Sequence, residues 1–335
     1  MLYPLRFSPV FKERVWGGRR LTRWFPDLPP GPVGEAWVLS DHPQGRTPIA
    51  NGPLRGETIH SLRRRFAEGG LGSGGTGAKW SDEALLGTRG VNPRTGEFPL
   101  LFKLLDAQDD LSIQVHPNDD FPGLPPGELG KSEMWVVLDA EPGARIVHGL
   151  AEGVGRGELA AAIREGRTME AMRSVTVHPG DVYYVPAGTV HALGAGLLVA
   201  EIQQSSDTTY RLYDYDRLGL DGRPRELHVD QALACASYNP PPAPSRLGSD
   251  AQTRWETLVS SPYFITAHGR CSGEWIQETD PGTFEVLMIL EGTGTITWSA
   301  GASERLAAGQ TWLVPAALGR YQLAGEFSAL RIRVP

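Results

Sequence analysis

Four side chains that can bind a metal ion lie beside short apolar runs in the first two thirds of the chain. In LSIQVHPND, polar and apolar residues alternate, which predicts a strand with one polar face. Side chains at positions i and i+2 of a strand point the same way, so Gln114 and His116 should lie side by side. Glu133 begins the apolar run in KSEMWVV, and His191 follows the turn in VPAGTVH. Two imidazoles, a carboxylate and an amide oxygen suit Zn²⁺, with Fe²⁺ and Mn²⁺ as alternatives.

Each of these residues, taken alone, also fits an ordinary structural role. A single histidine in a β-protein is more often a hydrogen-bonded structural residue than a ligand, and the other six histidines default to that role. Glu133 could simply begin an exposed strand. The prediction of a metal site therefore rests on the four residues in combination.

A polar segment, EIQQSSDTTYRLYDYDR at 201–217, is unusual for a strand that packs in a core. It is typical of a loop and strand that form the wall of a binding site, although a solvated loop would have a similar composition. Arg211 in this segment, with Lys103 and Lys131, can offer a phosphate group charge-assisted hydrogen bonds.

The overall composition limits the classes of function. The chain has 335 residues, 40% of them hydrophobic, and a net charge of −7, which argues against a nucleic-acid partner. The N-terminus has no apolar signal segment, and no apolar run reaches the length of a membrane span. Cys235 and Cys271 are far apart in sequence and suggest no disulfide framework. We therefore expect a cytoplasmic protein without a membrane partner; the oligomeric state is not indicated.

The many short apolar runs, punctuated by 41 glycines and 27 prolines, predict an all-β fold. Three stretches instead have the apolar spacing of helices, at 56–69, 155–175 and 226–236. The glycine-rich stretch 69–80 lacks the ending of a phosphate loop and is expected to be a flexible connection.

A repeated pattern divides the chain near the proline-rich stretch 239–250, which has the composition of a linker. GDVYYVPAGTVHAL is similar to GQTWLVPAALGRYQL, and EMWVVLDAEPGARI is similar to EVLMILEGTGTITW. His191 in the first copy falls opposite Arg320 in the second, so only the first copy keeps the metal-binding set. We predict a catalytic module at 1–240, with a helical insertion at 153–174, and a degenerate structural module at 250–335.

Four motifs together resemble the type I mannose-6-phosphate isomerase family, most closely its short bacterial form. They are FKERVWGG, PLLFKLLDAQDDLSIQVHPND, GELGKSEMWVVLDAEPGA and GDVYYVPAGTVHALGAGLLVAEIQQSSDTTYRLYDYDR. The resemblance is strong up to about Cys235 and looser beyond it. It implies a bicupin, with two jelly-roll modules and short helical insertions. It also implies one Zn²⁺ per chain and the interconversion of mannose 6-phosphate and fructose 6-phosphate through a cis-enediol.

The resemblance also implies roles for individual residues. The metal ligands would be Gln114, His116, Glu133 and His191, and the catalytic residues Arg211 and Lys131. As substrate contacts that anchor the phosphate we expect Ser112, Lys103, Lys131 and Arg211. The general base stays open among Lys131, a metal-bound water and the carboxylates Glu201, Asp207 and Asp214. Two alternatives are another metal-dependent sugar-phosphate isomerase or epimerase, and a sugar-binding bicupin that is not an enzyme.

Overall fold

The computed structural model describes residues 1–68, 80–125, 127–248 and 254–335. The predicted flexible connection at 69–80 lies outside the described residues except for Trp80. The chain forms two compact units. Unit 1 comprises Met1–Val10, Trp37–Pro99 and Leu247–Pro335, and unit 2 comprises Phe11–Ala36 and Leu100–Arg246. Unit 2 ends within the proline-rich stretch, whereas residues 1–10 and 37–99 cluster with the C-terminal segment. The catalytic and structural roles assigned to the two modules stay predictions.

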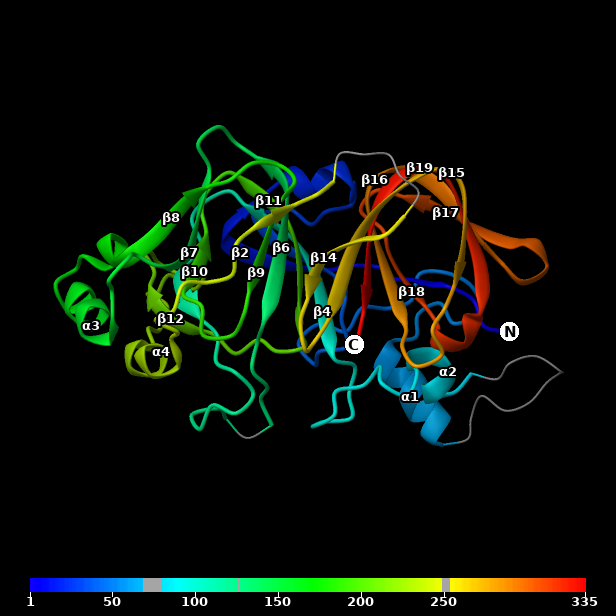
Figure 1. Ribbon diagram of the computed structural model, residues 1–335, viewed down its shortest axis with the longest axis horizontal. Coiled ribbons are helices and arrows are strands. Elements are labelled where there is room, and N and C mark those ends of the chain that lie inside the picture. The colour runs from blue at the N-terminus through cyan, green and yellow to red at the C-terminus, as the bar shows by residue number, and fades with distance from the viewer. Residues whose placement is uncertain (69–79, 126, 249–253) are drawn as a thin grey trace. The chain divides into compact units, whose positions relative to one another are not determined.

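Unit 2 contains two antiparallel sheets (Figure 1). The five-stranded sheet has the order β12 (Tyr210–Tyr213), β5 (Ile113–Val115), β10 (His191–Leu193), β7 (Arg145–Leu150) and β8 (Met172–Thr176). The seven-stranded sheet has the order β13 (Ser245–Arg246), β9 (Asp181–Val185), β6 (Glu133–Ala140), β11 (Leu197–Gln204), β4 (Leu100–Ala107), β2 (Val10–Gly18) and β3 (Val33–Leu39). Val10 of β2 and residues 37–39 of β3 are assigned to unit 1. A short 3₁₀ helix, η1 (Arg20–Arg23), follows β2.

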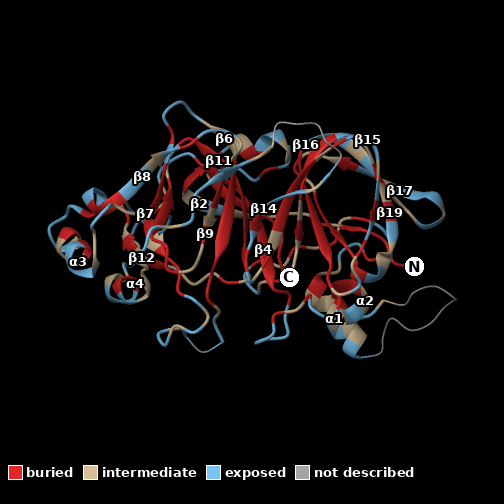
Figure 2. Cartoon of the chain, in the orientation of Figure 1, coloured by how far each residue is buried: buried red, intermediate tan, exposed pale blue. Residues whose placement is uncertain are grey.

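The core of unit 2 is built from apolar side chains of both sheets. One buried cluster includes Trp135 of β6, Ile146 of β7 and Val199 of β11. A second cluster joins the five-stranded sheet to α3 (Arg156–Arg164) and α4 (Val229–Cys235), through residues such as Leu159 and Leu233. Figure 2 shows β4 and β6 buried along most of their length. Packing from both sides of the five-stranded sheet gives the site rigid supporting strands.

Unit 1 is organised around one antiparallel sheet. Its strands follow the order β1 (Leu5–Arg6), β18 (Thr311–Val314), β16 (Glu285–Trp298), β19 (Arg320–Arg333), β15 (Ile265–Glu278) and β14 (Glu256–Ser260), and β17 (Ala302–Ala307) pairs with β16. The helical elements of this unit are α1 (Ile59–Ala67), α2 (Asp82–Leu86), η3 (Ser299–Gly301) and η4 (Ala316–Leu318). The long strands β15 and β19 pair from Ile265 opposite Arg333 to Glu278 opposite Arg320.

The structure confirms the predicted all-β class with few helices. The first and third predicted helices are present as α1 and α4. The second prediction was wrong at its C-terminal end: α3 stops at Arg164, η2 covers Thr168–Ala171, and Met172–Thr176 forms β8. The short helix α2 was not predicted. No helix in the described part of the chain is long and apolar enough to cross a membrane.

Candidate metal centre and substrate pocket

The five-stranded sheet aligns three predicted site residues in one row. Gln114 of β5 pairs with His191 of β10 on one side and with Arg211 of β12 on the other. Residues directly opposite each other in an antiparallel sheet present their side chains to the same face. β5 is shorter than the predicted strand, and His116 directly follows its last residue. Glu133 is the first residue of β6 and so comes from the other sheet of unit 2.

The imidazoles of His116 and His191 converge on the carboxylate of Glu133. His191 Nε2 lies 3.4 Å from Glu133 Oε1, and His116 Nε2 lies 3.5 Å from Glu133 Oε2. These donor atoms all lie within 4.8 Å of one another, and the three side chains are at most 1% exposed. His116 Nε2 makes no hydrogen bond to any described residue. A buried polar atom without a partner is costly, so this cluster has the character of a site that receives a cation.

Hydrogen bonds on the far side of each ring orient both histidines. His116 Nδ1 donates to the carbonyl oxygen of Thr208 at 2.9 Å, and His191 Nδ1 donates to that of Thr189 at 2.8 Å. A proton on Nδ1 leaves a lone pair on Nε2, the atom that faces Glu133. The carbonyls therefore fix the tautomer that a metal ligand needs.

The ionisation of the cluster favours cation binding as well. Burial, together with the positive charge of Lys131, lowers the pKa of His116 to about 3. Burial also lowers the pKa of His191. For Glu133, burial acts to raise the pKa, but Lys131 and both histidines hold it well below the usual value. Neutral imidazoles and an ionised carboxylate are the forms that bind a metal.

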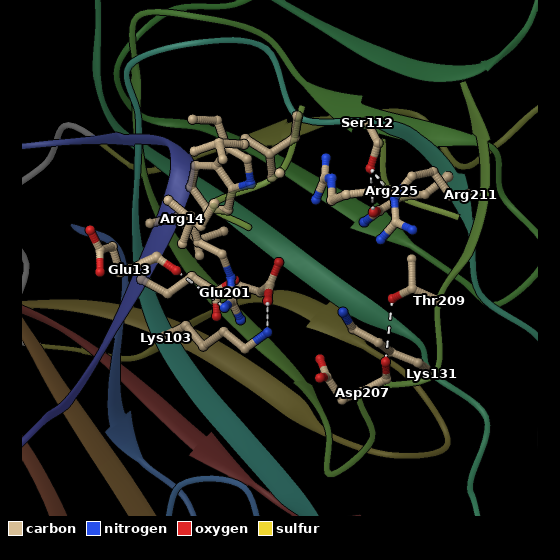
Figure 3. Close-up of a pocket in the computed structure, with 18 of the residues that line it drawn as sticks. Glu13, Arg14, Lys103, Ser112, Lys131, Glu201, Asp207, Thr209, Arg211 and Arg225 are labelled. Carbon is tan, nitrogen blue, oxygen red and sulfur yellow. Dashed lines mark hydrogen bonds and ion pairs between the residues drawn. The ribbon is translucent and has the colours of Figure 1, made fainter. Parts of the chain in front are cut away.

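Gln114 and Lys131 form the boundary between this cluster and a pocket of about 570 Å³. Gln114 Nε2 lies 3.3 Å from His191 Nε2, and Lys131 Nζ lies 2.9 Å from Glu133 Oε2. The predicted substrate residues Ser112, Lys103, Lys131 and Arg211 all line the pocket, as do Glu201, Asp207 and Thr209. Figure 3 shows Ser112 beside Arg211, and Lys131 beside Asp207. The structure thus brings all the predicted site residues to one pocket and the buried cluster behind it.

A buried ion pair forms part of the pocket floor. Lys103 of β4 lies opposite Glu201 of β11, and their Nζ and Oε1 atoms are 3.0 Å apart. Glu201 Oε2 also accepts a hydrogen bond of 3.1 Å from Trp135 Nε1. Burial would lower the pKa of Lys103, but Glu201 and Glu35 raise it overall. Lys103 is therefore a charged residue that neutralises pocket carboxylates as well as a candidate substrate contact.

The carboxylates considered as bases differ in their surroundings. Asp214 does not line the pocket, and its oxygens bind Arg217 and Arg225. Asp207 does line the pocket, and its carboxylate makes no hydrogen bond to a described residue. This geometry makes Asp214 an anchor for arginines and leaves Asp207 able to accept a proton.

Sequence reasoning missed two arginines of the pocket, Arg14 and Arg225. Arg14 is held by Glu35, with Nε 2.8 Å from Oε1, and Arg225 is held by Asp214. Arg14 belongs to the motif FKERVWGG, so its presence in a matching motif was the available signal. Arg225 lies in no such motif.

Comparisons with known proteins place the chain in a family. It is 37% identical over 330 residues to the mannose-6-phosphate isomerase ManA of Bacillus subtilis, covering 96% of each chain. It belongs to the mannose-6-phosphate isomerase family. The family's Streptococcus mutans member is 35% identical, with 98% of each chain covered. Residues 76–126 match the model of the catalytic domain of type I phosphomannose isomerase.

The fold agrees with this family as well. The crystal structure of the Bacillus subtilis mannose 6-phosphate isomerase superposes with a TM-score of 0.82 at 34% identity, covering 98% of this chain and 99% of that one. A phosphomannose isomerase from Salmonella typhimurium shares the fold at 17% identity, with a TM-score of 0.71 and 98% of both chains covered. The β-rich architecture expected from the resemblance is confirmed.

Proposed function

We propose that this chain is a metal-dependent aldose–ketose isomerase that interconverts mannose 6-phosphate and fructose 6-phosphate. The observation that carries the proposal is the buried His116–Glu133–His191 cluster, which adjoins a pocket with several cationic side chains. Family membership supports the reaction, since the relatives over nearly the whole chain are named for it. We also propose that the protein is cytoplasmic, as expected from its sequence.

The residues present fit one Zn²⁺ per chain, with Fe²⁺ and Mn²⁺ as alternatives. His116, His191 and Glu133 would supply two nitrogens and a carboxylate oxygen. Gln114 would be the fourth ligand. A half-turn of its amide would present Oε1 to the cluster and its NH₂ group to Ser112 Oγ, which now lies 3.3 Å from Oε1. When bound, the metal would act as a Lewis acid that polarises the substrate carbonyl.

The isomerisation moves a proton between C1 and C2 of the sugar through a cis-enediol. We propose that Lys131, which contacts Glu133 beside Gln114, stabilises the negative charge that develops on the sugar oxygens, while Arg211 holds the substrate from another part of the pocket wall. Asp207 is the pocket carboxylate best placed to carry the proton, because Glu201 is already bound to Lys103 and Trp135. Ser112 and Lys103 would contact the substrate from the pocket wall.

An assay of the purified chain tests the proposal directly. Mannose 6-phosphate conversion to fructose 6-phosphate should disappear after chelation and return when Zn²⁺ is added. Asp207→Asn should lower kcat by at least about a hundredfold, as expected for loss of a general acid–base group, while the bound metal is retained. Full activity in the chelated protein, or conversion of glucose 6-phosphate in preference, would contradict the proposal.

A further inference from the structure

One end of the pocket contains two arginines whose terminal nitrogens are only partly used within the protein. Arg211 donates from Nε to Ser112 Oγ at 3.2 Å and from Nη1 to the Glu226 carbonyl at 2.8 Å. Arg225 donates from Nε and Nη2 to the two oxygens of Asp214, at 2.7 and 2.5 Å. Arg211 Nη2 and Arg225 Nη1 make no hydrogen bond to a described residue. Each side chain is therefore held in place and still has one donor group to offer.

Three arginine side chains gather around Asp214 at this end of the pocket. Asp214, only 5% exposed, pairs with both Arg225 and Arg217, whose Nη2 lies 2.8 Å from Asp214 Oδ1. Arg211 lies near the same group, and burial together with Arg225 lowers its pKa. Figure 3 shows Arg211 and Arg225 side by side next to Ser112, away from Glu13. Asp221 also lines this pocket, but its carboxylate accepts a hydrogen bond from Arg223 N, and Asp214 pairs with Arg217 and Arg225. A bound dianion would gain charge-assisted hydrogen bonds from Arg211 and Arg225.

The loop that carries Arg225 is closed by its own backbone. Gly219 N donates to the carbonyl of Arg223 at 2.7 Å, and Leu218 forms an isolated bridge with Pro224. Immediately before this loop, Tyr215 and Asp216 both have positive φ, at 56° and 52°, a conformation that costs energy for residues other than glycine. The strained turn brings Arg217 back to Asp214, so the same carboxylate fixes both ends of the loop.

Building on the proposed function, we propose that Arg225 and Arg211 together bind the phosphate group of the substrate through their uncommitted terminal nitrogens. Asp214 is the positioning residue: it holds Arg225 Nε and Nη2 and directs the guanidinium plane to the pocket. The two guanidinium groups bind a phosphate dianion at the end of the pocket that they form with Ser112. The sugar carbons then extend towards Gln114 and Lys131, the boundary of the metal cluster.

Calorimetric titration of the Zn²⁺-loaded full chain with inorganic phosphate tests this subsite without reference to turnover. Arg225→Ala should weaken phosphate binding by about tenfold or more, the effect of losing a charge-assisted hydrogen bond. The KM for mannose 6-phosphate should rise by a similar factor, with kcat changed by less than about threefold. Asp214→Asn should give a smaller rise in KM, also without a large loss of kcat.

Arg217→Ala is the matched control, because Arg217 pairs with the same carboxylate but does not line the pocket. It should leave phosphate binding within about twofold of the parent. Equal losses in the Arg217 and Arg225 variants would show that only loop integrity matters and would overturn the subsite. Recovery of phosphate binding in the Asp214→Asn, Arg225→Ala double variant would also overturn the subsite. The weaker binding in Arg225→Ala would then be explained by the negative charge of Asp214, left without Arg225, and not by a lost contact to phosphate.

The two proposals fail in different ways. A parent chain that binds phosphate through Arg225 but does not convert mannose 6-phosphate would refute the proposed reaction and retain the subsite. A parent chain that isomerises normally but binds phosphate independently of Arg225 would refute the subsite alone.

Discussion

The hydroxyl of Tyr321 should contribute substantially to the stability of unit 1, because it donates a hydrogen bond to a buried carboxylate. Tyr321 Oη donates a hydrogen bond of 2.6 Å to Glu285 Oε2, and both residues are at most 2% exposed. Arg331 supplies a positive charge on the other side of the carboxylate, with Nη1 3.5 Å from Glu285 Oε1. Burial, followed by the charge of Glu285, raises the pKa of Tyr321 well above its usual value, so the hydroxyl stays protonated at neutral pH.

Tyr321→Phe removes the hydroxyl with little change in volume, so packing is preserved. The hydrogen bond has a charged acceptor, and its loss leaves a carboxylate oxygen without a donor. We therefore expect the free energy of unfolding to fall by about 2–3 kcal/mol. In a Glu285→Gln background the acceptor is neutral, and the same substitution should cost only about 1 kcal/mol.

Urea unfolding followed by tryptophan fluorescence measures these differences, since Trp312 lies in the same buried cluster as Tyr321. Metal content should stay unchanged in every variant, because the His116–Glu133–His191 cluster belongs to unit 2. The reasoning is refuted if Tyr321→Phe costs less than about 0.5 kcal/mol, or equally much with Glu285 and with Gln at position 285.

Three further predictions follow from other buried groups. His191→Ala should abolish both bound metal and isomerase activity; a variant that retains one metal per chain on metal analysis after dialysis would contradict its assignment. Lys103→Met leaves the buried charge of Glu201 without its ion pair and should lower stability in urea by about 3–5 kcal/mol, and a loss below about 1 kcal/mol would count against that pair. Burial raises the pKa of Asp41 to about 6, so the folded state favours the protonated carboxyl group. The contribution of Asp41 to the free energy of unfolding is therefore complete below pH 3.8 and is lost as the pH rises through 6. Asp41→Asn should therefore stabilise the protein by up to about 3 kcal/mol at pH 7–8 and by nothing at pH 3.5; a pH-independent difference in thermal stability would exclude this explanation.

The parts of the site that sequence alone predicted are those with local patterns. Alternation placed Gln114 and His116 on one strand face, and the VPAG turn marked the entry to the strand of His191. Glu133 meets His116 and His191 only because the two sheets of unit 2 pack together, and no local sequence pattern predicts that packing. Before the structure, Glu133 was grouped with the other three residues because of their ligand chemistry in combination and because the motifs resemble a family.

Features determined by long-range contacts were not predicted. Leu5 pairs with Leu313, and this pairing places the N-terminal strand in unit 1 although the first ten residues were predicted to belong to the catalytic module at 1–240. Arg225 reaches the pocket because Asp214 binds it across a turn with unusual backbone angles. Residues 172–175 have helix-like apolar spacing, but pairing of β8 with β7 makes them a strand, so tertiary contacts override the local preference.

The repeated motifs explain why a carboxylate is found at the same place in both units. Glu133 pairs with Val185 of β9, and Glu285 pairs with Val314 of β18; each valine precedes the Pro-Ala of its motif. A buried carboxylate at the first residue of a strand needs a positive or hydrogen-donating partner. Around Glu133 these partners are Lys131 and the proposed metal, whereas Tyr321 and Arg331 surround Glu285. Because these two partners already satisfy Glu285, the unit 1 carboxylate needs no metal to remain buried, and a chelator that destabilises unit 2 should leave the Tyr321–Glu285 interaction intact.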